Sequence, residues 1–363
     1  MPARFKSIAL PLALLVLSGA IHAQTVDTTP DPHACVSLQS DALRLACYDK
    51  ILGHQTTPAK TKPEPRSMDQ GRVRVFDMEQ RASERTQHAE HAPVSLLDSR
   101  WELADNTKLG TFNVRGYKPV YLLPVFYTSD VNHSPYSPTH QLSTPLKQQP
   151  EHLEAKFQLS LKTKVWQGIF GDAGDLWLGY TQSSHWQVYS DQYSRPFRET
   201  NYEPEAMLVF NTHYNVFGWQ GRLLGLGVNH QSNGRGGELS RSWNRIIARV
   251  GFERPGWTVM FRPWWRISEN RADDDNPDIS DYMGRADLRV VHEWDGQELS
   301  VLLRHSLRSG SRSHGAVQLD WAFPIKDHLR GHLQFFDGYG ESMIDYNHRA
   351  MYFGLGVSLL EWY

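Results

Sequence analysis

The chain has 363 residues, and its 38 basic and 40 acidic side chains nearly balance. Because the charges balance and the sequence has no stripe of basic residues, the composition gives no case for nucleic-acid binding. Aromatic residues make up 12% of the chain, which fits a transmembrane barrel whose apolar and polar residues alternate better than it fits a soluble core.

Residues 1–23 have the layout of a secretory signal peptide. Arg4 and Lys6 precede an apolar run of thirteen residues from Ile8 to Ala20, and small residues near its end offer cleavage sites. The run is too short to cross a bilayer, and no other segment approaches the roughly 18 apolar residues of a helical span. We therefore expect the chain to be exported; the alternative is that the apolar run is a buried core helix. If the protein resides in a membrane, it must cross it as a β-barrel.

Residues 24–93 are predicted to form a periplasmic N-terminal extension. Cys35 and Cys47 are expected to pair, because an exported chain reaches an oxidising compartment. Closing such a loop stabilises a fold by about 3 kcal/mol, and the alternative is two unpaired thiols. Ser40–Leu45 between them resembles a capped helical turn, while residues 53–93 have the polar, Pro-rich composition of a flexible linker.

Twelve strand-like segments bounded by turn residues follow from Tyr117 onward, and an even strand number is what closed outer-membrane barrels have. We therefore predict an all-β fold over residues 94–363, a twelve-stranded antiparallel transmembrane β-barrel. The segments are Lys118–Tyr127, His152–Val165, Asp175–Tyr189, Met207–Tyr214, Arg222–Ser232, Ser242–Glu253, Trp257–Ile267, Tyr282–Glu293, Glu298–His305, Ala316–Phe323, Leu329–Phe336 and Met351–Trp362.

Each segment has one apolar face and one polar face. Charges on the second face would line the barrel lumen, which we expect to be filled by a paired polar network and not left as a wide pore. A soluble β-sandwich also has one apolar face per strand, but it does not explain a signal peptide together with an Arg-rich second face. The lumenal charges are Arg249, Arg262, Arg285, Asp287, Arg289, Arg304 and Asp320.

Three polar residues continue the apolar faces of two successive predicted strands. His230 and Ser232 keep the parity of the apolar residues before them, and Asn244 begins the apolar face of the next strand. If the two strands pair as a hairpin across Gln231 and Trp243, all three converge on the outside of the sheet.

These residue types suit nucleophilic catalysis. A serine needs a base to take its proton, and a histidine two residues away on the same strand face lies about 6.5 to 7 Å distant along the backbone. The carbonyl of Asn244 could orient the imidazole, although an amide stabilises an imidazolium less than Asp does. Backbone N–H groups of the turn after Ser232, or a metal, could stabilise an oxyanion. On this motif alone, a surface histidine beside a turn serine remains the alternative.

The chain resembles outer-membrane phospholipase A of Gram-negative bacteria from about Tyr117 to Tyr363. This resemblance implies a twelve-stranded barrel that hydrolyses acyl esters of glycerophospholipids, with calcium as cofactor and a homodimer as the active form. The blocks that carry it are Asn229–Arg235, Ser240–Arg245, Pro196–Pro204, Asp274–Ile279 and Gly338–Ser342.

The resemblance also implies residue roles. Ser232 is the expected nucleophile, His230 the general base, Asn244 its orienting partner, and the Gly234 amide the oxyanion donor. The expected calcium ligands are Ser194 from one subunit, the Arg235 carbonyl and the Ser240 hydroxyl from the other, with Asp275 as a further ligand or a group behind the ligands. Such oxygen donors suit a weak hard-cation site completed by water. Gln182 matches a polar residue at the lipid-facing dimer interface.

Two departures limit what the resemblance implies. Residues 236–239, in the loop before Ser240, differ from the sequence of the family, so the calcium ligands are less well supported than the triad. Shorter family members lack the region from Cys35 to Pro93, so the resemblance implies no role for it. The resulting hypothesis is a calcium-dependent phospholipase A1 and A2 with lysophospholipase activity. It would act on membrane phospholipids as a calcium-promoted homodimer in the outer membrane of a Gram-negative bacterium. The alternative is a non-catalytic barrel, a porin or a scaffold.

Overall fold

The computed structural model describes residues 35, 36, 40, 43–45, 47, 48, 95–142, 146, 149–171 and 173–362. The chain divides into two compact units, Met1–Arg72 and Val73–Tyr363. The predicted signal peptide and the predicted linker over residues 53–93 lie outside the described residues. No helix in the described part of the chain is long and apolar enough to cross a membrane.

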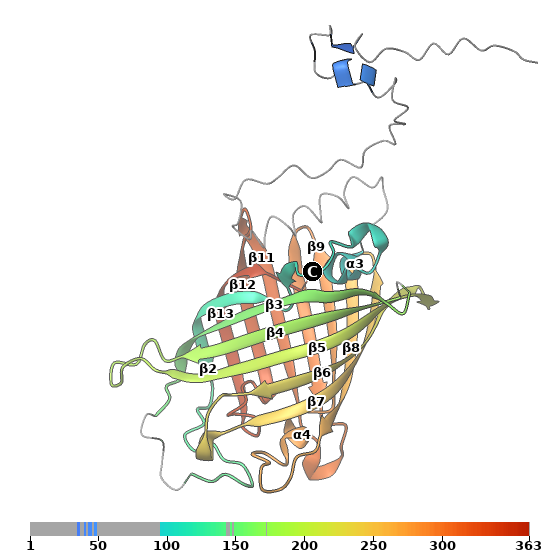
Figure 1. The fold of residues 1–363 in the computed structure, drawn as a ribbon. Coiled ribbons are helices and arrows are strands. Elements are labelled where there is room, and N and C mark those ends of the chain that lie inside the picture. The colour runs from blue at the N-terminus through green and yellow to red at the C-terminus, as the bar shows by residue number, and fades with distance from the viewer. Residues whose placement is uncertain are drawn as a thin grey trace, which may run out of the picture. The chain divides into compact units, whose positions relative to one another are not determined.

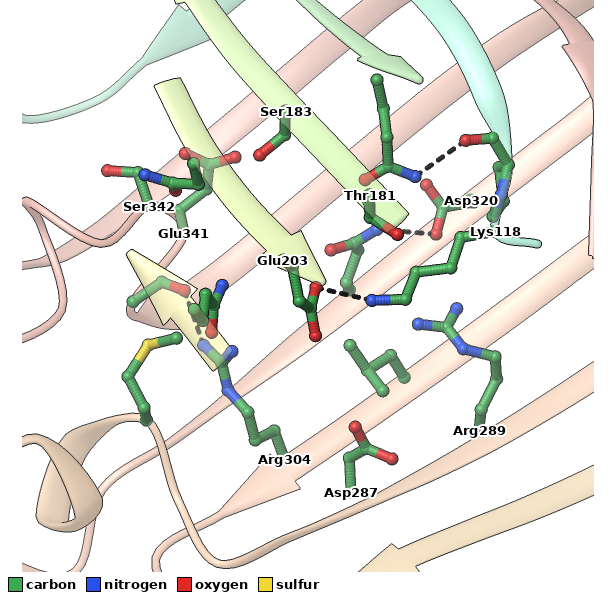
Figure 2. Close-up of a pocket in the computed structure, with 18 of the residues that line it drawn as sticks. Lys118, Thr181, Ser183, Glu203, Asp287, Arg289, Arg304, Asp320, Glu341 and Ser342 are labelled. Atoms are coloured by element: carbon green, nitrogen blue, oxygen red, sulfur yellow. Dashed lines mark hydrogen bonds and ion pairs between the residues drawn. The ribbon is translucent and has the colours of Figure 1, made fainter. Parts of the chain in front are cut away.

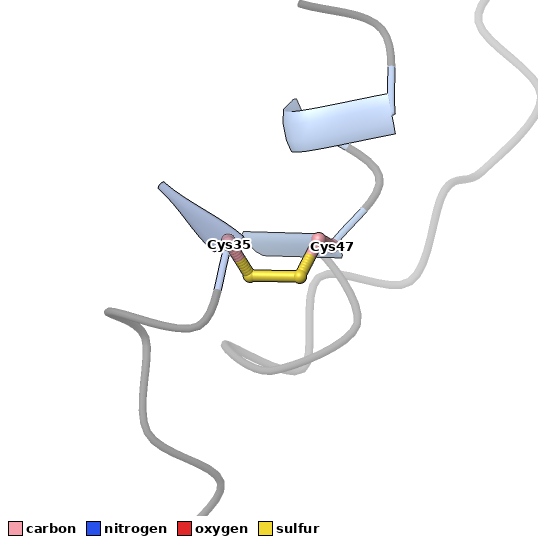
Figure 3. The surroundings of a disulfide bond; sticks show 2 residues. All are labelled: Cys35 and Cys47. Carbon is pink, nitrogen blue, oxygen red and sulfur yellow. A yellow bond between two sulfur atoms is a disulfide. The ribbon is translucent and has the colours of Figure 1, made fainter. Parts of the chain in front are cut away.

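In the first unit, a disulfide joins Cys35 and Cys47 (Figure 3), the pairing that the sequence predicts. Their Cα atoms lie 5.7 Å apart. Between them, the Arg44 amide donates to the Ser40 carbonyl at 2.9 Å. This bond closes the helical turn expected there.

The second unit contains a closed antiparallel β-barrel, which confirms the predicted fold class (Figure 1). Strands that follow one another in sequence pair with one another, and β13 pairs with β2 to close the cylinder. A short strand, β1 (Val114–Gly116), pairs with β3 beyond the end of β2. The strands of the cylinder are β2 (Val120–Thr128), β3 (Leu153–Ile169), β4 (Gly174–Trp186), β5 (Phe197–Val216), β6 (Trp219–Ser232), β7 (Ser242–Arg254), β8 (Trp257–Ile267), β9 (Ala286–Trp294), β10 (Gln297–His305), β11 (Gly315–Lys326), β12 (Leu329–Tyr339) and β13 (Arg349–Leu360).

Alternation along each strand separates an apolar outer wall from a polar interior. On β6, Leu224, Leu226 and Val228 are 46%, 52% and 54% exposed, whereas the residues between them are buried. In water such an exposed apolar surface would be unfavourable, and in a bilayer lipid covers it. The wall therefore fits a membrane environment.

The polar interior is a network of ion pairs, as the sequence predicts. Arg249 pairs with Glu205 at 2.7 Å and Arg262 with Asp287 at 2.5 Å. Figure 2 shows the central cavity, where the Lys118 ammonium lies 2.6 Å from a Glu203 carboxylate oxygen. Since buried charges are costly unless they are paired, this network accounts for so many ionised groups inside the wall.

Apolar clusters fill the lumen at its two ends, where Figure 1 shows α3 and α4. At one end, α3 (Leu96–Trp101) begins at the N-cap Ser95, whose hydroxyl accepts from the Asp98 amide. Leu97 and Trp101 of this helix pack among inward side chains of the barrel wall. At the other end, α4 (Ile279–Tyr282) contributes to a second cluster, which includes Trp243 and Tyr346.

Three predictions, two about strand boundaries and one about a lumenal charge, are wrong. Strand β5 begins at Phe197, ten residues before the predicted start at Met207. Tyr282 ends α4, so β9 begins only at Ala286. Arg285 consequently lies outside the lumen and binds loop groups, including the Asp281 carboxylate at 2.9 Å.

Candidate active site

The candidate catalytic residues lie at the end of the hairpin that β6 and β7 form. Gln231 pairs with Trp243 in the register, so His230 faces Asn244 across the two strands. The Nδ1 atom of His230 lies 2.8 Å from the Oδ1 atom of Asn244. Ser232 follows two residues after His230 and ends β6. The structure thus brings His230 into contact with Asn244 on the outer wall, where His230 is exposed, and places Ser232 on the same face of β6.

Asn233 organises the turn that follows Ser232. Its backbone amide donates to the Arg241 carbonyl at 3.0 Å. Its side-chain oxygen accepts from the amides of Arg241 at 3.0 Å and Arg235 at 3.3 Å, and its Nδ2 donates to the Leu239 carbonyl at 2.8 Å. This buried amide therefore ties both sides of the loop together.

Gly234, the predicted oxyanion donor, follows in that turn with a φ of +64°. Residues with a Cβ rarely adopt this left-handed conformation, whereas glycine adopts it at little cost. A Cβ built on Gly234 would also lie 2.8 Å from the Tyr202 ring. Both observations explain a glycine at this position.

Two of the predicted calcium ligands are in contact. The Ser240 hydroxyl donates to Asp275 Oδ2 at 2.6 Å, and Ser242 lies 3.4 Å from the same oxygen. On the other side of the carboxylate, His140 Nε2 lies 2.8 Å from Asp275 Oδ1. A hydroxyl and a carboxylate are hard oxygen donors, so this pair fits a calcium ion.

The other predicted ligands lie on neighbouring loops. Arg235 is in the same β6–β7 loop, and its guanidinium donates to the Arg198 carbonyl. Ser194 is exposed in the loop between β4 and β5. No cluster of three or more His, Cys, Asp or Glu side chains that could hold a metal occurs among the described residues. A calcium site here would rely on hydroxyl, carbonyl and water oxygens beside Asp275.

Arg241 supports the residues around Ser240. Its Nη1 atom donates to the carbonyls of Ser240 at 2.7 Å and Glu238 at 3.1 Å. Burial lowers the pKa of this guanidinium, although Tyr346, Glu199 and Asp275 oppose the shift. The guanidinium thus fixes the backbone within the short helix η4 (Gly237–Leu239) and at its C-cap, Ser240.

Gln182, the predicted dimer residue, lies on β4 within the apolar wall. Its Oε1 atom accepts from the Tyr180 hydroxyl at 3.1 Å. Tyr202 on β5 pairs with Gln182 on one side and with Ser232 on the other. Gln182 and the candidate nucleophile therefore share one row of residues across three strands.

Sequence reasoning missed two residues of the site, Glu269 and His140. Glu269 Oε1 accepts from Asn244 Nδ2 at 2.7 Å, and His140 contacts Asp275. Ile267, the last residue of β8, pairs with Asn244 in the register, so Glu269 follows two residues later with the same parity. Extending that parity beyond the predicted strand could have indicated Glu269, whereas no pattern in the sequence indicates His140.

Comparison with known proteins identifies the family. The family model of phospholipase A1 matches residues 97–359. A phospholipase A1 of Klebsiella pneumoniae is 43% identical over 206 residues, which are 57% of this chain and 70% of the relative. A protein of Neisseria meningitidis is 37% identical over 346 residues, 89% of each chain. The crystal structure of a Salmonella typhi outer membrane phospholipase dimer with bound calcium is similar with a TM-score of 0.62 and 37% identity, covering 69% of this chain and 94% of that one. The chain belongs to the phospholipase A1 family.

Proposed function

We propose that this protein is a calcium-dependent phospholipase A1 and A2, with lysophospholipase activity, in the outer membrane of a Gram-negative bacterium. The observation that carries the proposal is the 2.8 Å contact between His230 and Asn244 on the lipid-facing wall, with Ser232 two residues away. A hydrolase whose substrate is a membrane lipid needs its nucleophile on this outer surface. The family match and the apolar wall support the same substrate class.

The proposed reaction proceeds through an acyl-enzyme. His230 Nε2 takes the proton of the Ser232 hydroxyl as Ser232 Oγ attacks the ester carbonyl. The backbone amide of Gly234 donates to the oxyanion that forms. When the carbon–oxygen ester bond breaks, His230 gives its proton to the departing lysophospholipid. A water molecule, deprotonated by His230, then attacks the acyl-Ser232 ester, which releases the fatty acid and returns the proton to Ser232.

The oxygen donors Ser240, Asp275, the Arg235 carbonyl and Ser194 of a second subunit are proposed to hold calcium. Bound there, the ion would supply positive charge near the developing oxyanion. Support comes from the contact between Ser240 and Asp275, and from the calcium in the Salmonella typhi structure. The exposed position of Ser194, in a separate loop, suits a ligand that completes the site of a neighbouring copy.

The proposed active form is a homodimer that buries the wall around Gln182. An amide within an apolar surface is more favourable when a second amide pairs with it than when it faces hydrocarbon. Sedimentation in detergent with and without calcium tests this assembly. We expect dimers with calcium and monomers after chelation, and the same mass under both conditions would count against calcium-promoted assembly.

Release of fatty acid from mixed phospholipid micelles tests the activity. We expect Ser232→Ala to lower kcat on the order of 10⁶-fold, because no other group replaces the nucleophile. Ser313→Ala, an exposed serine in the loop between β10 and β11, is the matched control and should retain full activity. Chelation of calcium should also abolish release.

Release that persists in Ser232→Ala would refute the mechanism. Conductance across planar bilayers without lipase activity of the native protein would instead favour the alternative of a porin. The paired charges in the lumen and the apolar clusters at its ends argue against that alternative.

A further inference from the structure

Glu269 makes a contact that the reaction above does not use. It lies just beyond β8, and its Oε1 atom accepts from Asn244 Nδ2 at 2.7 Å. On its other side, Asn244 Oδ1 faces His230 Nδ1 at 2.8 Å. One amide therefore connects a carboxylate to the candidate general base. A role for Glu269 in catalysis rests on the proposed function and extends it.

The carboxylate decides which way the Asn244 amide faces. An ionised carboxylate has only acceptor oxygens, so the NH₂ group of Asn244 must face Glu269. The reversed amide would place two oxygen atoms 2.7 Å apart without a hydrogen between them. With NH₂ toward Glu269, the Asn244 carbonyl oxygen faces His230.

This orientation sets the protonation of His230. A carbonyl oxygen only accepts, so it selects the tautomer of a neutral imidazole with hydrogen on Nδ1. The lone pair is then on Nε2, the atom that must take the Ser232 proton. Without Glu269, an Asn244 side chain turned by half a rotation would present NH₂ to His230 and select the opposite, inactive tautomer.

Glu269 also adds the negative charge that an asparagine lacks. Its side chain is 20% exposed, and its Oε2 atom lies 3.7 Å from Arg266 Nη2. Arg266 is held in turn by Asp274 at 2.6 Å. Because the hydrogen-bonded amide transmits polarisation, the carboxylate makes the Asn244 carbonyl a stronger acceptor when His230 becomes positively charged.

We infer that Glu269 is a positioning residue, which fixes the Asn244 amide and supplies the negative charge at the end of a chain of side chains, Ser232–His230–Asn244–Glu269. With Glu269 bound to it, Asn244 could perform both functions of the aspartate in a serine hydrolase, which are to orient the histidine and to provide negative charge.

The first test is the kcat and KM of Glu269→Gln in mixed micelles at saturating calcium. Glutamine keeps the size but can present oxygen or NH₂ to Asn244 and carries no charge. We expect kcat to fall about ten- to a hundredfold, the range of a hydrogen bond to a charged group, with KM unchanged. Asp273→Asn, which removes an exposed carboxylate from the same loop, is the matched control and should leave kcat unchanged.

The second test exchanges the charges. Asn244→Asp places two carboxylates against each other, so we expect it to impair activity. Adding Glu269→Gln should restore activity at least about tenfold relative to Asn244→Asp, since the glutamine NH₂ can donate to the new aspartate. If Glu269 only supported the fold, Glu269→Gln would not lower activity in the native protein and raise it in Asn244→Asp.

Equal kcat for Glu269→Gln and the native protein, or the same loss in both backgrounds, would overturn the role of Glu269. Such results alongside an inactive Ser232→Ala variant leave the proposed function intact. Full activity of Ser232→Ala overturns the proposed function itself. Far-ultraviolet circular dichroism of each variant separates these outcomes from loss of the barrel.

Discussion

At the scale of single residues, Gly234 shows how the turn after the proposed nucleophile limits substitution. Its φ of +64° and its distance to Tyr202 leave no room for a side chain. Gly236, two residues later, has a φ of −113°, and a Cβ added there would have no neighbouring atom within 4 Å. Gly234 and Gly236, in the same loop, thus have opposite tolerance for alanine.

We predict that Gly234→Ala lowers kcat strongly, whereas Gly236→Ala leaves it unchanged. The strained backbone costs about 1 to 2 kcal/mol, and the contact with Tyr202 displaces the amide proposed to stabilise the oxyanion. Fatty-acid release by the two variants measures this. Equal activity of Gly234→Ala and Gly236→Ala would contradict the assigned role of the turn.

The shared face of the three candidate residues could be predicted from the sequence because each belongs to a strand, whereas their proposed roles come from the family resemblance. Period two fixes the outward direction of His230, Ser232 and Asn244, and the hairpin register then makes His230 face Asn244. His140 lies in a loop, where no periodicity sets the direction of a side chain, so its contact with Asp275 depends on tertiary structure. Glu269 lies two residues beyond β8 and keeps the parity of that strand, but the predicted strand ended at Ile267.

At the scale of elements, the strands were predictable where one face is apolar throughout. The first half of β5 was missed because charged residues interrupt its alternation, and Pro204 lowers its strand propensity. That half is nevertheless paired with β4 along its length. Helix α3 was missed as well, since it is only six residues long, too short for a helical repeat of apolar residues.

Asp345 connects three elements at the end of the barrel that carries the site. Its carboxylate accepts from Asn132 at 3.0 Å, Arg198 at 2.7 Å and Ser342 at 2.8 Å. Burial alone would raise the pKa of Asp345, but the charge of Arg198 and these hydrogen bonds lower it below its ordinary value of 3.8. The ionised carboxylate therefore stabilises the folded loops.

We predict that this stabilisation depends on pH with a definite sign. A lowered pKa means that the contribution is complete above pH 3.8 and is lost as the pH falls from 3.8 through the folded value. Asp345→Asn should be less stable at neutral pH and should lack this part of the acid dependence. Urea unfolding in detergent at a series of pH values measures it.

Asp327→Asn, an exposed residue in the turn between β11 and β12, is the control and should keep the native dependence. If Asp345→Asn and the native protein lose stability in parallel on acidification, Asp345 does not contribute in this way.

At the scale of the whole molecule, the interior and the exterior of the barrel have separate tasks. The interior is filled by ion pairs and by clusters around α3 and α4, so it supports the wall. The exterior carries the apolar surface together with His230, Ser232 and Asn244. Chemistry on the outer surface would require no passage through the barrel, because the proposed substrate is part of the membrane.

The central claim is that Ser232 on this outer surface is the nucleophile. The most direct measurement treats the native protein, in detergent with calcium, with a lipophilic fluorophosphonate and locates the label by peptide mass spectrometry. Such a reagent reacts with a serine that a neighbouring base activates. We predict a single label, on the peptide that contains Ser232, and none in Ser232→Ala. A label on another serine, or equal labelling of the Ser232→Ala variant, would contradict the claim.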